Sequence, residues 1–250
     1  PAADVVSVET AGEEQLRVTL DGELLIGTTT VTPHVRLNQK LGVVQVGNYG
    51  GVSLTNYGGT AAVNKAILDF NRSRGTSNAS MTSVASNDGL GHVVFRGADG
   101  TNFVDSVGIR AQVDGTPGTN DMPGRLVFET TSDGSNSLSE RMRIDSSGRV
   151  MIGTTTEGES TADDLTIATS GSTGITIRTG TTNQGNIYFA DGTSGASQYA
   201  GLISYNHNTN HMFFGTNDGT ERLRIDSSGR VMIGTTTEGE STADDLTIAT

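Results

Sequence analysis

The chain has 250 residues, a formal net charge of −12 and 34 glycines, with no cysteine and no tryptophan. The acidic balance argues against binding of nucleic acid or anionic lipid, both of which need clustered basic side chains. The lack of cysteine excludes disulfides and thiolate metal sites, and no apolar run approaches the roughly 18 residues of a membrane-spanning helix. Glycine makes up much of the apolar fraction of the residues and buries little side-chain surface. A hydrophobic core within one chain would therefore be small, and burial of apolar side chains between several chains is favoured.

The first predicted element is a β-hairpin over residues 14–30. Apolar and polar residues alternate on both sides of the loop 20–22, which is the period of half-buried strands. Two apolar pairs are predicted across this hairpin: Leu16 with Ile26 and Val18 with Leu24. The segment is a degenerate copy of a motif, here called the joint, that returns twice further along the chain.

Residues 31–139 form the longer of two inserts between the joints. Short β-like runs are separated by turns rich in Asp-Gly pairs and in the sequence Asn-Tyr-Gly-Gly, which tolerate the positive φ angles of hairpin turns. The predicted strands are Val43–Val46, Gly51–Thr55, Ala66–Phe70, His92–Arg96, Val107–Val113 and Arg125–Glu129. Residues 61–71 could also form a helix, but their alternation favours a strand at least equally.

The second joint, 140–169, and the third, 221–250, differ only at Met142 and Leu223. A three-residue loop, 146–148, ends in Gly148, which suits the left-handed conformation that such hairpins need. The predicted cross-strand pairs are Ile144 with Val150, Met142 with Ile152 and Asp145 with Arg149. Because the apolar pattern and the glycine persist in all three copies while the charges change, we interpret the joint as structural.

Residues 154–164 lack apolar periodicity and are predicted to be an exposed link leading into a strand at 165–169. The shorter insert, 170–220, is interpreted as a reduced copy of the longer one. Three pairs of segments align: His92–Gly97 with Asn186–Asp191, Val107–Gln112 with Ala200–Tyr205, and Arg125–Gly134 with His211–Gly219. Both inserts should therefore share one strand order, with Phe128 and Phe214 at equivalent positions.

These patterns predict an all-β protein of short antiparallel strands, in sandwich-like or prism-like modules connected by repeated hairpins. The expected divisions are a first hairpin repeat at 1–30, a larger module at 31–139, a second joint and linker strand at 140–169, a smaller module at 170–220 and a third joint at 221–250. Because the chain starts without a methionine and ends within a repeat, we expect it to be a segment of a longer protein.

Adjacent acidic residues, Asp163 and Asp164, recur at Asp244 and Asp245, and such a pair could act as the carboxylates of a glycosidase. Neighbouring residues on an extended strand point to opposite faces, so they do not readily flank one bond. The scarcity of aromatic residues also disfavours a sugar-cleaving site. We predict a solvated turn here and no catalytic residue.

Histidines give one weak candidate for a metal site. His207 and His211 have a spacing that could form a shared site on a three-fold axis, although a turn between two strands explains the same residues. His34 and His92 are isolated and are predicted to be packing or surface residues. We therefore expect no metal and no cofactor.

Charged residues of the joint also recur, at Arg143 and Asp145 and again at Arg224 and Asp226. Recurrence could mark a ligand site, but cross-strand charge pairing, within or between chains, explains it without a ligand. The glycine pairs at 50–51 and 58–59 lack a following lysine and helix, which excludes a phosphate loop.

The joint Arg143-Ile-Asp-Ser-Ser-Gly-Arg-Val-Met-Ile-Gly-Thr-Thr155, with Gly185-Asn-Ile-Tyr-Phe-Ala-Asp-Gly192 upstream of its next copy, resembles tail-fibre proteins of tailed bacteriophages, especially phages of marine cyanobacteria. The resemblance covers most of 85–250, and through the joint alone 14–30. It implies the distal shaft of an elongated homotrimeric fibre, a structural component of the virion tail that is assembled in the host cytoplasm and has no catalytic activity. The family's tail-anchoring module and its C-terminal chaperone are not found in this sequence.

The same resemblance implies the partners: other tail proteins, and a polysaccharide or protein of the bacterial surface to which the fibre attaches, with no nucleic acid and no membrane insertion. Two alternatives remain open. One is a tailspike enzyme that degrades host polysaccharide, and the other is a bacterial surface adhesin or a different virion adaptor.

Overall fold

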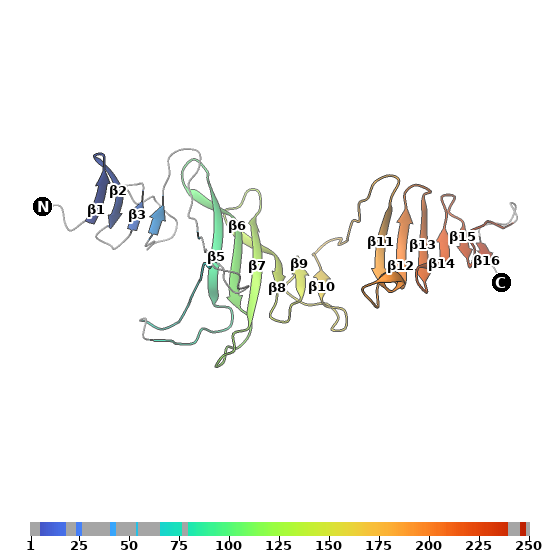
Figure 1. Ribbon diagram of the computed structural model, residues 1–250, viewed down its shortest axis with the longest axis horizontal. Coiled ribbons are helices and arrows are strands. Elements are labelled where there is room, and N and C mark those ends of the chain that lie inside the picture. The colour runs from blue at the N-terminus through green and yellow to red at the C-terminus, as the bar shows by residue number, and fades with distance from the viewer. Residues whose placement is uncertain are drawn as a thin grey trace. The chain divides into compact units, whose positions relative to one another are not determined.

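The computed structural model describes residues 6–18, 24–26, 41–43, 54, 66–76, 80–239 and 246–248. Within these ranges the regular structure is β-strand, apart from one 3₁₀ turn at Gly195–Tyr199, and there is no α-helix (Figure 1). The predicted all-β class is confirmed. The chain divides into two compact units, Pro1–Thr173 and Gly174–Thr250.

The strands form three sheets, in each of which every strand pairs with the next one in the chain. The first sheet contains β1 (Val6–Thr10), β2 (Glu13–Val18), β3 (Leu24–Ile26) and β4 (Leu41–Val43). The second contains β5 (Gly89–Ala98), β6 (Phe103–Val113), β7 (Gly124–Thr131), β8 (Leu138–Ile144), β9 (Val150–Ile152) and β10 (Leu165–Ile167). The third contains β11 (Gln184–Phe189), β12 (Gly201–Asn206), β13 (His211–Thr216), β14 (Thr220–Ile225), β15 (Val231–Ile233) and β16 (Leu246–Ile248).

One topology is repeated in all three sheets. Neighbouring strands are antiparallel except for the last pair of each sheet, β3–β4, β9–β10 and β15–β16, which is parallel. In the second and third sheets the joint supplies nearly all of the last three strands, whereas in the first sheet the joint at 14–30 supplies β2 and β3, and β4 lies beyond it, in the segment predicted as the longer insert. The predicted hairpins and the strand after the second one are confirmed. The described pairs include Met142 with Ile152 and Leu16 with Ile26. The common strand order of the two inserts is also confirmed.

The register collects apolar residues into unbroken rows across the sheets. In the second sheet one row is Val93, Ile109, Phe128, Met142, Ile152 and Ile167. The equivalent positions of the third sheet are Ile187, Ile203, Phe214, Leu223, Ile233 and Ile248. Phe128 and Phe214 are equivalent, as predicted. The row two residues further along each strand lies on the same face and is also largely apolar, since alternate residues of a strand share a face.

These apolar rows are exposed, although apolar residues usually lie inside a fold. Val93 is 41% exposed and Ile187 is 48% exposed. Contacts between the described elements run along each sheet, from strand to neighbouring strand, and no second sheet covers the rows. Each described sheet is thus a single layer whose apolar face is covered only in part, by Phe70 over Gly91 in the second sheet and by Ile177 over Gly185 in the third.

The opposite face of the second sheet is charged and better buried. Val127 is fully buried between Arg110 and Arg143 in the register, and Met151, on the far side of Arg143, is 2% exposed. Long arginine stems shield such small apolar neighbours while their charged ends stay near water. Glu129 is buried on this face as well.

A β-bulge recurs at the same place in all three sheets. The register shifts between Val8 and Glu9, between Phe128 and Glu129, and between Phe214 and Gly215. Each shift leaves one extra residue in the next strand, which is Arg141 in the second sheet and Arg222 in the third. The backbone carbonyls of these two residues accept hydrogen bonds of 2.9 Å from the backbone amides of Gly153 and Gly234, respectively. A recurring bulge is a built feature of a sheet, not a defect.

At one equivalent position, the two larger sheets carry the large side chain on different strands. In the second sheet Gly108 of β6 lies opposite Glu129 of β7, whereas in the third Leu202 of β12 lies opposite Gly215 of β13. A Cβ atom on Gly108 would lie 3.2 Å from Glu129 Oε2, and one on Gly215 would lie 3.0 Å from Leu202 Cγ. The large side chain therefore comes from different strands in the two copies, and the space at the site is filled once.

Three sequence-based predictions need correction or lie outside the described ranges. Residues 66–71 are neither strand nor helix; instead, Phe70 approaches the backbone of Gly91 so closely that a Cβ there would lie 2.8 Å from its ring. The alignment of 107–112 with 200–205 is wrong by one residue, because the register makes Ile109 equivalent to Ile203. Of the predicted strands at 43–46 and 51–55, only Val43 and Leu54 are described.

Gly148→Val is expected to lower the free energy of unfolding by about 1–2 kcal/mol, because a side chain with a Cβ pays roughly that cost in the left-handed region. Gly148 has a φ of +84° with open space around it, so strain and not a clash would be responsible. Urea denaturation monitored by circular dichroism measures the effect. Gly174→Val is the control, since that glycine also faces open space and lies outside the positive-φ set. Equal stability of the two variants would contradict the strained-turn explanation.

Gly108→Leu is expected to destabilise the larger module by about 1–3 kcal/mol through overpacking. Adding His92→Asn, Arg110→Ser and Glu129→Gly, which installs the residues of the smaller module at equivalent positions, should recover most of that loss. Thermal and urea unfolding of the single and quadruple variants give the comparison. If the quadruple variant is no more stable than Gly108→Leu, the residues of the smaller module do not make room for a leucine at position 108.

Candidate functional site

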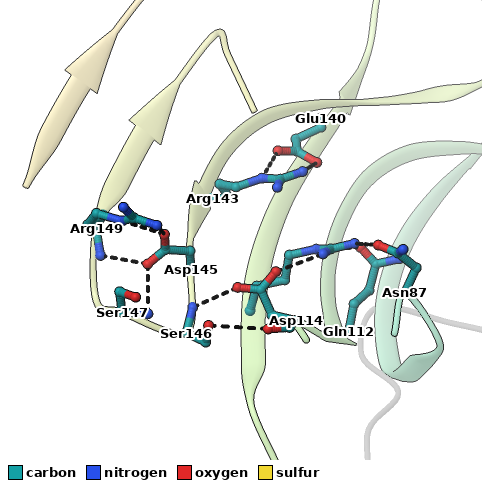
Figure 2. Close-up of polar contacts among 10 residues, drawn as sticks. Asn87, Gln112, Asp114, Glu140, Arg143, Asp145, Ser146, Ser147 and Arg149 are labelled. Atoms are coloured by element: carbon teal, nitrogen blue, oxygen red, sulfur yellow. Dashed lines mark hydrogen bonds and ion pairs between the residues drawn. The ribbon is translucent and has the colours of Figure 1, made fainter. Parts of the chain in front are cut away.

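The turn of the second joint is held by ion pairs and capping hydrogen bonds (Figure 2). Arg149 donates from Nε to Asp145 Oδ2 at 2.7 Å, and the backbone amides of Ser147 and Arg149 both donate to Asp145 Oδ1 at 2.9 Å. The predicted pairing of Asp145 with Arg149 is confirmed. The third joint repeats it, with Arg230 Nε 2.8 Å from Asp226 Oδ2.

A second ion pair, between Glu and Arg three residues apart, occurs in every joint. Arg143 Nε lies 2.5 Å from Glu140 Oε1, and the same pairing joins Arg17 to Glu14 and Arg224 to Glu221 at 2.6 Å. Residues three apart on a regular strand face opposite sides. The bulge between them shifts the alternation by one residue and returns both side chains to one face, which is why strand periodicity did not predict the pair.

The joint turn is also anchored to the loop between β6 and β7. Asp114 accepts hydrogen bonds of 2.8 Å from the Ser146 backbone amide and from Arg125 Nη1, and Arg125 Nη2 donates to Asn87 Oδ1 at 2.6 Å. Figure 2 shows Asp114 and Ser146 facing each other. No sequence signal pointed to this contact, because 32 residues separate the two partners.

Electrostatics favour the charged forms of these carboxyl groups. Burial by itself raises the pKa of Asp145, but the hydrogen bonds from Arg149 and Ser147 outweigh it, and the pKa lies below its ordinary value. Burial likewise opposes ionisation of Asp114, whose pKa is nevertheless lowered by Arg125 and Ser146. The acceptors of the network are already occupied by protein donors, and the arrangement acts as a clamp.

The two residues of the acidic pair lie in different environments. Asp163 Oδ2 accepts a hydrogen bond of 2.9 Å from Arg149 Nη1 and is half-buried, so for this residue the predicted solvated turn is wrong; Asp164 is exposed. The counterparts Asp244 and Asp245 lie outside the described ranges.

His207 and His211 do not come together. His207 stacks edge-on against Tyr205 with a ring separation of 4.9 Å, whereas His211 contacts Phe213, on the opposite face of the sheet, at 5.6 Å. Burial, with the nearby charge of Arg224, lowers the pKa of His211, and its Nδ1 hydrogen-bonds to the hydroxyl of Thr209.

His92 takes part in a buried charged group, and His34 lies outside the described ranges. His92 Nε2 lies 3.1 Å from Glu129 Oε2, and Arg110 Nη2 lies 2.6 Å from Glu129 Oε1. Among the side chains that the structure describes, no three His, Asp or Glu residues gather to hold a metal ion. No helix in the described ranges is long and apolar enough to cross a membrane.

Comparison with protein-family models gives no match, and neither does comparison with curated protein sequences. Among solved structures, the carboxy-terminal domain of the bacteriophage T5 L-shaped tail fibre with its intramolecular chaperone domain aligns at a TM-score of 0.43 and 12% identity, covering 76% of this chain and 64% of that one. A second structure of that carboxy-terminal domain aligns at a TM-score of 0.35 and 12% identity, covering 72% and 90%.

The chain is similar to a bacteriophage tail fibre. It spans less than two thirds of the length of the first of these structures. At 12% identity these alignments transfer no individual residue.

Asp145→Asn is expected to lower the free energy of unfolding at pH 7 by about 1–3 kcal/mol, the range for hydrogen bonds to a charged group. Because the folded-state pKa of Asp145 is depressed, the stabilisation is present above the unfolded-state pKa, ordinarily 3.8, and is lost as pH falls through the folded value. The stabilities of wild type and variant should therefore converge as the pH falls through the depressed folded-state pKa of Asp145. Asp164→Asn is the matched exposed control, and an equal loss in that variant would contradict the clamp.

Proposed function

We propose that this chain is a structural segment of a bacteriophage tail fibre, a parallel homotrimer in the virion tail that holds the fibre together and contributes to attachment to the bacterial surface. The observation that carries the proposal is the open apolar face. Each six-stranded sheet has two largely apolar rows on one side, and no second sheet covers that side within the described chain. The opposite side carries paired charged residues, most of them in the second sheet.

Copies of the same chain are the cover that fits best. Because the rows recur at equivalent positions of each sheet, parallel copies in register bring like rows together along their whole length. On the smaller module a groove of about 250 Å³ lies beside these rows, lined by Ile187, Ile203 and Met212 and bordered by Ile177. An apolar side chain from a neighbouring copy would fill it.

Three copies agree with the resemblance of the joint to phage fibres. The apolar faces would meet around a common axis, and the charged faces, with a net charge of −12 per chain, would point outward and keep the assemblies soluble. Several fibres on one virion would bind a surface together, so that weak individual contacts sum to strong attachment. We place the segment outside the cell, on the virion tail, after assembly in the host cytoplasm.

A non-catalytic role is proposed because the recurring charged residues neutralise one another. The carboxylates of the joints accept hydrogen bonds from arginines and backbone amides, and the acidic pair 163–164 is divided between an ion pair and an exposed position. The residue ranges of joints and modules given above are proposed as the structural divisions of the fibre segment. No observation specifically favours the tailspike or the adhesin.

Phe214→Glu is expected to dissociate the assembly of the 250-residue chain. Wild type should sediment near three times 25.9 kDa and the variant near the monomer mass. The reason is that burying a carboxylate without a partner costs roughly several kcal/mol of assembly free energy in each copy. Ser227→Glu, in the exposed joint turn, is the control and should leave the trimer intact.

A folded wild-type monomer would refute assembly through the apolar rows. Adsorption competition, in which the purified segment is added to host cells before phage, tests attachment separately from assembly. Release of soluble sugar from purified host polysaccharide by the segment would refute the non-catalytic role.

A further inference from the structure

The two larger sheets differ most in the turns at one end of their strands. The segments 96–106 and 190–200 have the same length and connect equivalent strand positions, Phe95 with Val107 and Phe189 with Gly201. In the larger module this segment continues the hairpin, whereas in the smaller one it contains the 3₁₀ turn 195–199. The sheet therefore does not dictate the fold of this tip, and loops on a constant scaffold commonly carry recognition.

At the same end of its strands, the larger module has a second elongated turn. Six residues, 132–137, connect β7 to β8, where three, 217–219, connect the equivalent strands β13 and β14. The two tips of the larger module line a hollow of about 430 Å³ that is open to solvent and within the size range of small-molecule sites. Its lining residues are Asp99, Asn102, Phe103, Val104, Asp105 and Asn136.

We propose that this hollow binds a neutral saccharide of the bacterial surface, an inference that rests on the attachment role proposed above. The residue types fit that chemistry. Carboxylates accept hydrogen bonds from sugar hydroxyls, and the amides of Asn102 and Asn136 both donate and accept. Phe103 is 41% exposed at the hollow and offers an aromatic ring to the C–H face of a pyranose.

Contacts around the hollow hold its polar groups in place before a ligand arrives. Asp99 Oδ1 accepts the backbone amides of Thr101 and Asn102 at 2.7 Å, and these bonds lower the pKa of Asp99, which keeps it ionised. Asp105 pairs with Arg96 at 2.5 Å, and its backbone oxygen accepts a hydrogen bond of 2.7 Å from the Thr131 hydroxyl. A prearranged site loses less entropy on binding.

The charge of the hollow selects among sugars. Two lining residues are carboxylates, and Arg96, the cation nearest in the register, is already paired. An acidic sugar would bring a third negative charge and be repelled. Neutral sugars are therefore preferred.

The test uses the full 250-residue chain and a panel of methyl glycosides of glucose, galactose, mannose and N-acetylglucosamine, with N-acetylneuraminic acid as the acidic comparison. Saturation-transfer NMR detects binding, and titration gives the dissociation constant. At least one neutral glycoside should bind, and Phe103→Ala should weaken it about tenfold, equivalent to about 1.4 kcal/mol. Phe103→Tyr, which keeps the ring, should retain most of the affinity.

Asp99→Asn should also weaken binding, whereas Asp133→Asn, a carboxylate in the neighbouring turn outside the hollow, should leave it unchanged. Circular dichroism and thermal unfolding identify any variant that fails to fold. If a variant fails to fold, Asn136→Ala replaces that variant as the binding test, because Asn136 lies in the exposed turn between β7 and β8.

Binding that survives Phe103→Ala and Asn136→Ala overturns the location, and the absence of binding by every neutral glycoside overturns the ligand class. Tighter binding of N-acetylneuraminic acid would do the same. Calcium binding that Asp99→Asn abolishes, without any saccharide binding, would make the hollow a cation site instead. Each failure leaves the sedimentation and adsorption tests untouched, so it is distinguishable from failure of the fibre role.

Discussion

The structure depends on the segregation of side chains by a strand register that never changes face across six strands. A residue in one strand lies opposite its partner in the next, so a single apolar position, once repeated, becomes a continuous row such as that through Phe128 and Met142. A single-layer sheet cannot bury both faces by itself. On the charged face of the second sheet, ion pairs and arginine stems cover the apolar residues. On the apolar face, no second sheet of the described chain covers the rows.

The joints keep this register from slipping. A slip of one residue would turn every apolar side chain to the charged face. The bulge opposed by Phe128 or Phe214, the turn glycine and the Asp–Arg pair all fix the position of one strand against the next. Because the Glu–Arg pair forms only when the bulge is present, register and charge pairing support each other. The repetition of this device explains why the joint sequence is so constant between the second and third copies.

The modules vary where the joints do not. The exchange of bulk between Gly108 and Leu202 leaves the sheet unchanged, and the tips at 96–106 and 190–200 take different folds on equivalent strands. The same arrangement of strands therefore tolerates both kinds of change. Under the fibre role proposed above, the constant strands would maintain the structure and the tips would be free to differ.

Much of this fold was predictable from the sequence. The period of two in Met142 to Ile152, the loop glycine and the near-identical repeats determined the hairpins, their pairs and the equivalence of Phe128 and Phe214, because these depend on local alternation alone. Tertiary structure decided the rest. The Glu140–Arg143 pair required a bulge, and the Asp114–Ser146 contact required chain segments distant in sequence to meet. The position of Ile203 was fixed by the pairing of β12 with β13. The hollow at Phe103 likewise exists only because two turns meet at one edge of the sheet, and sequence periodicity carries no information about such meetings.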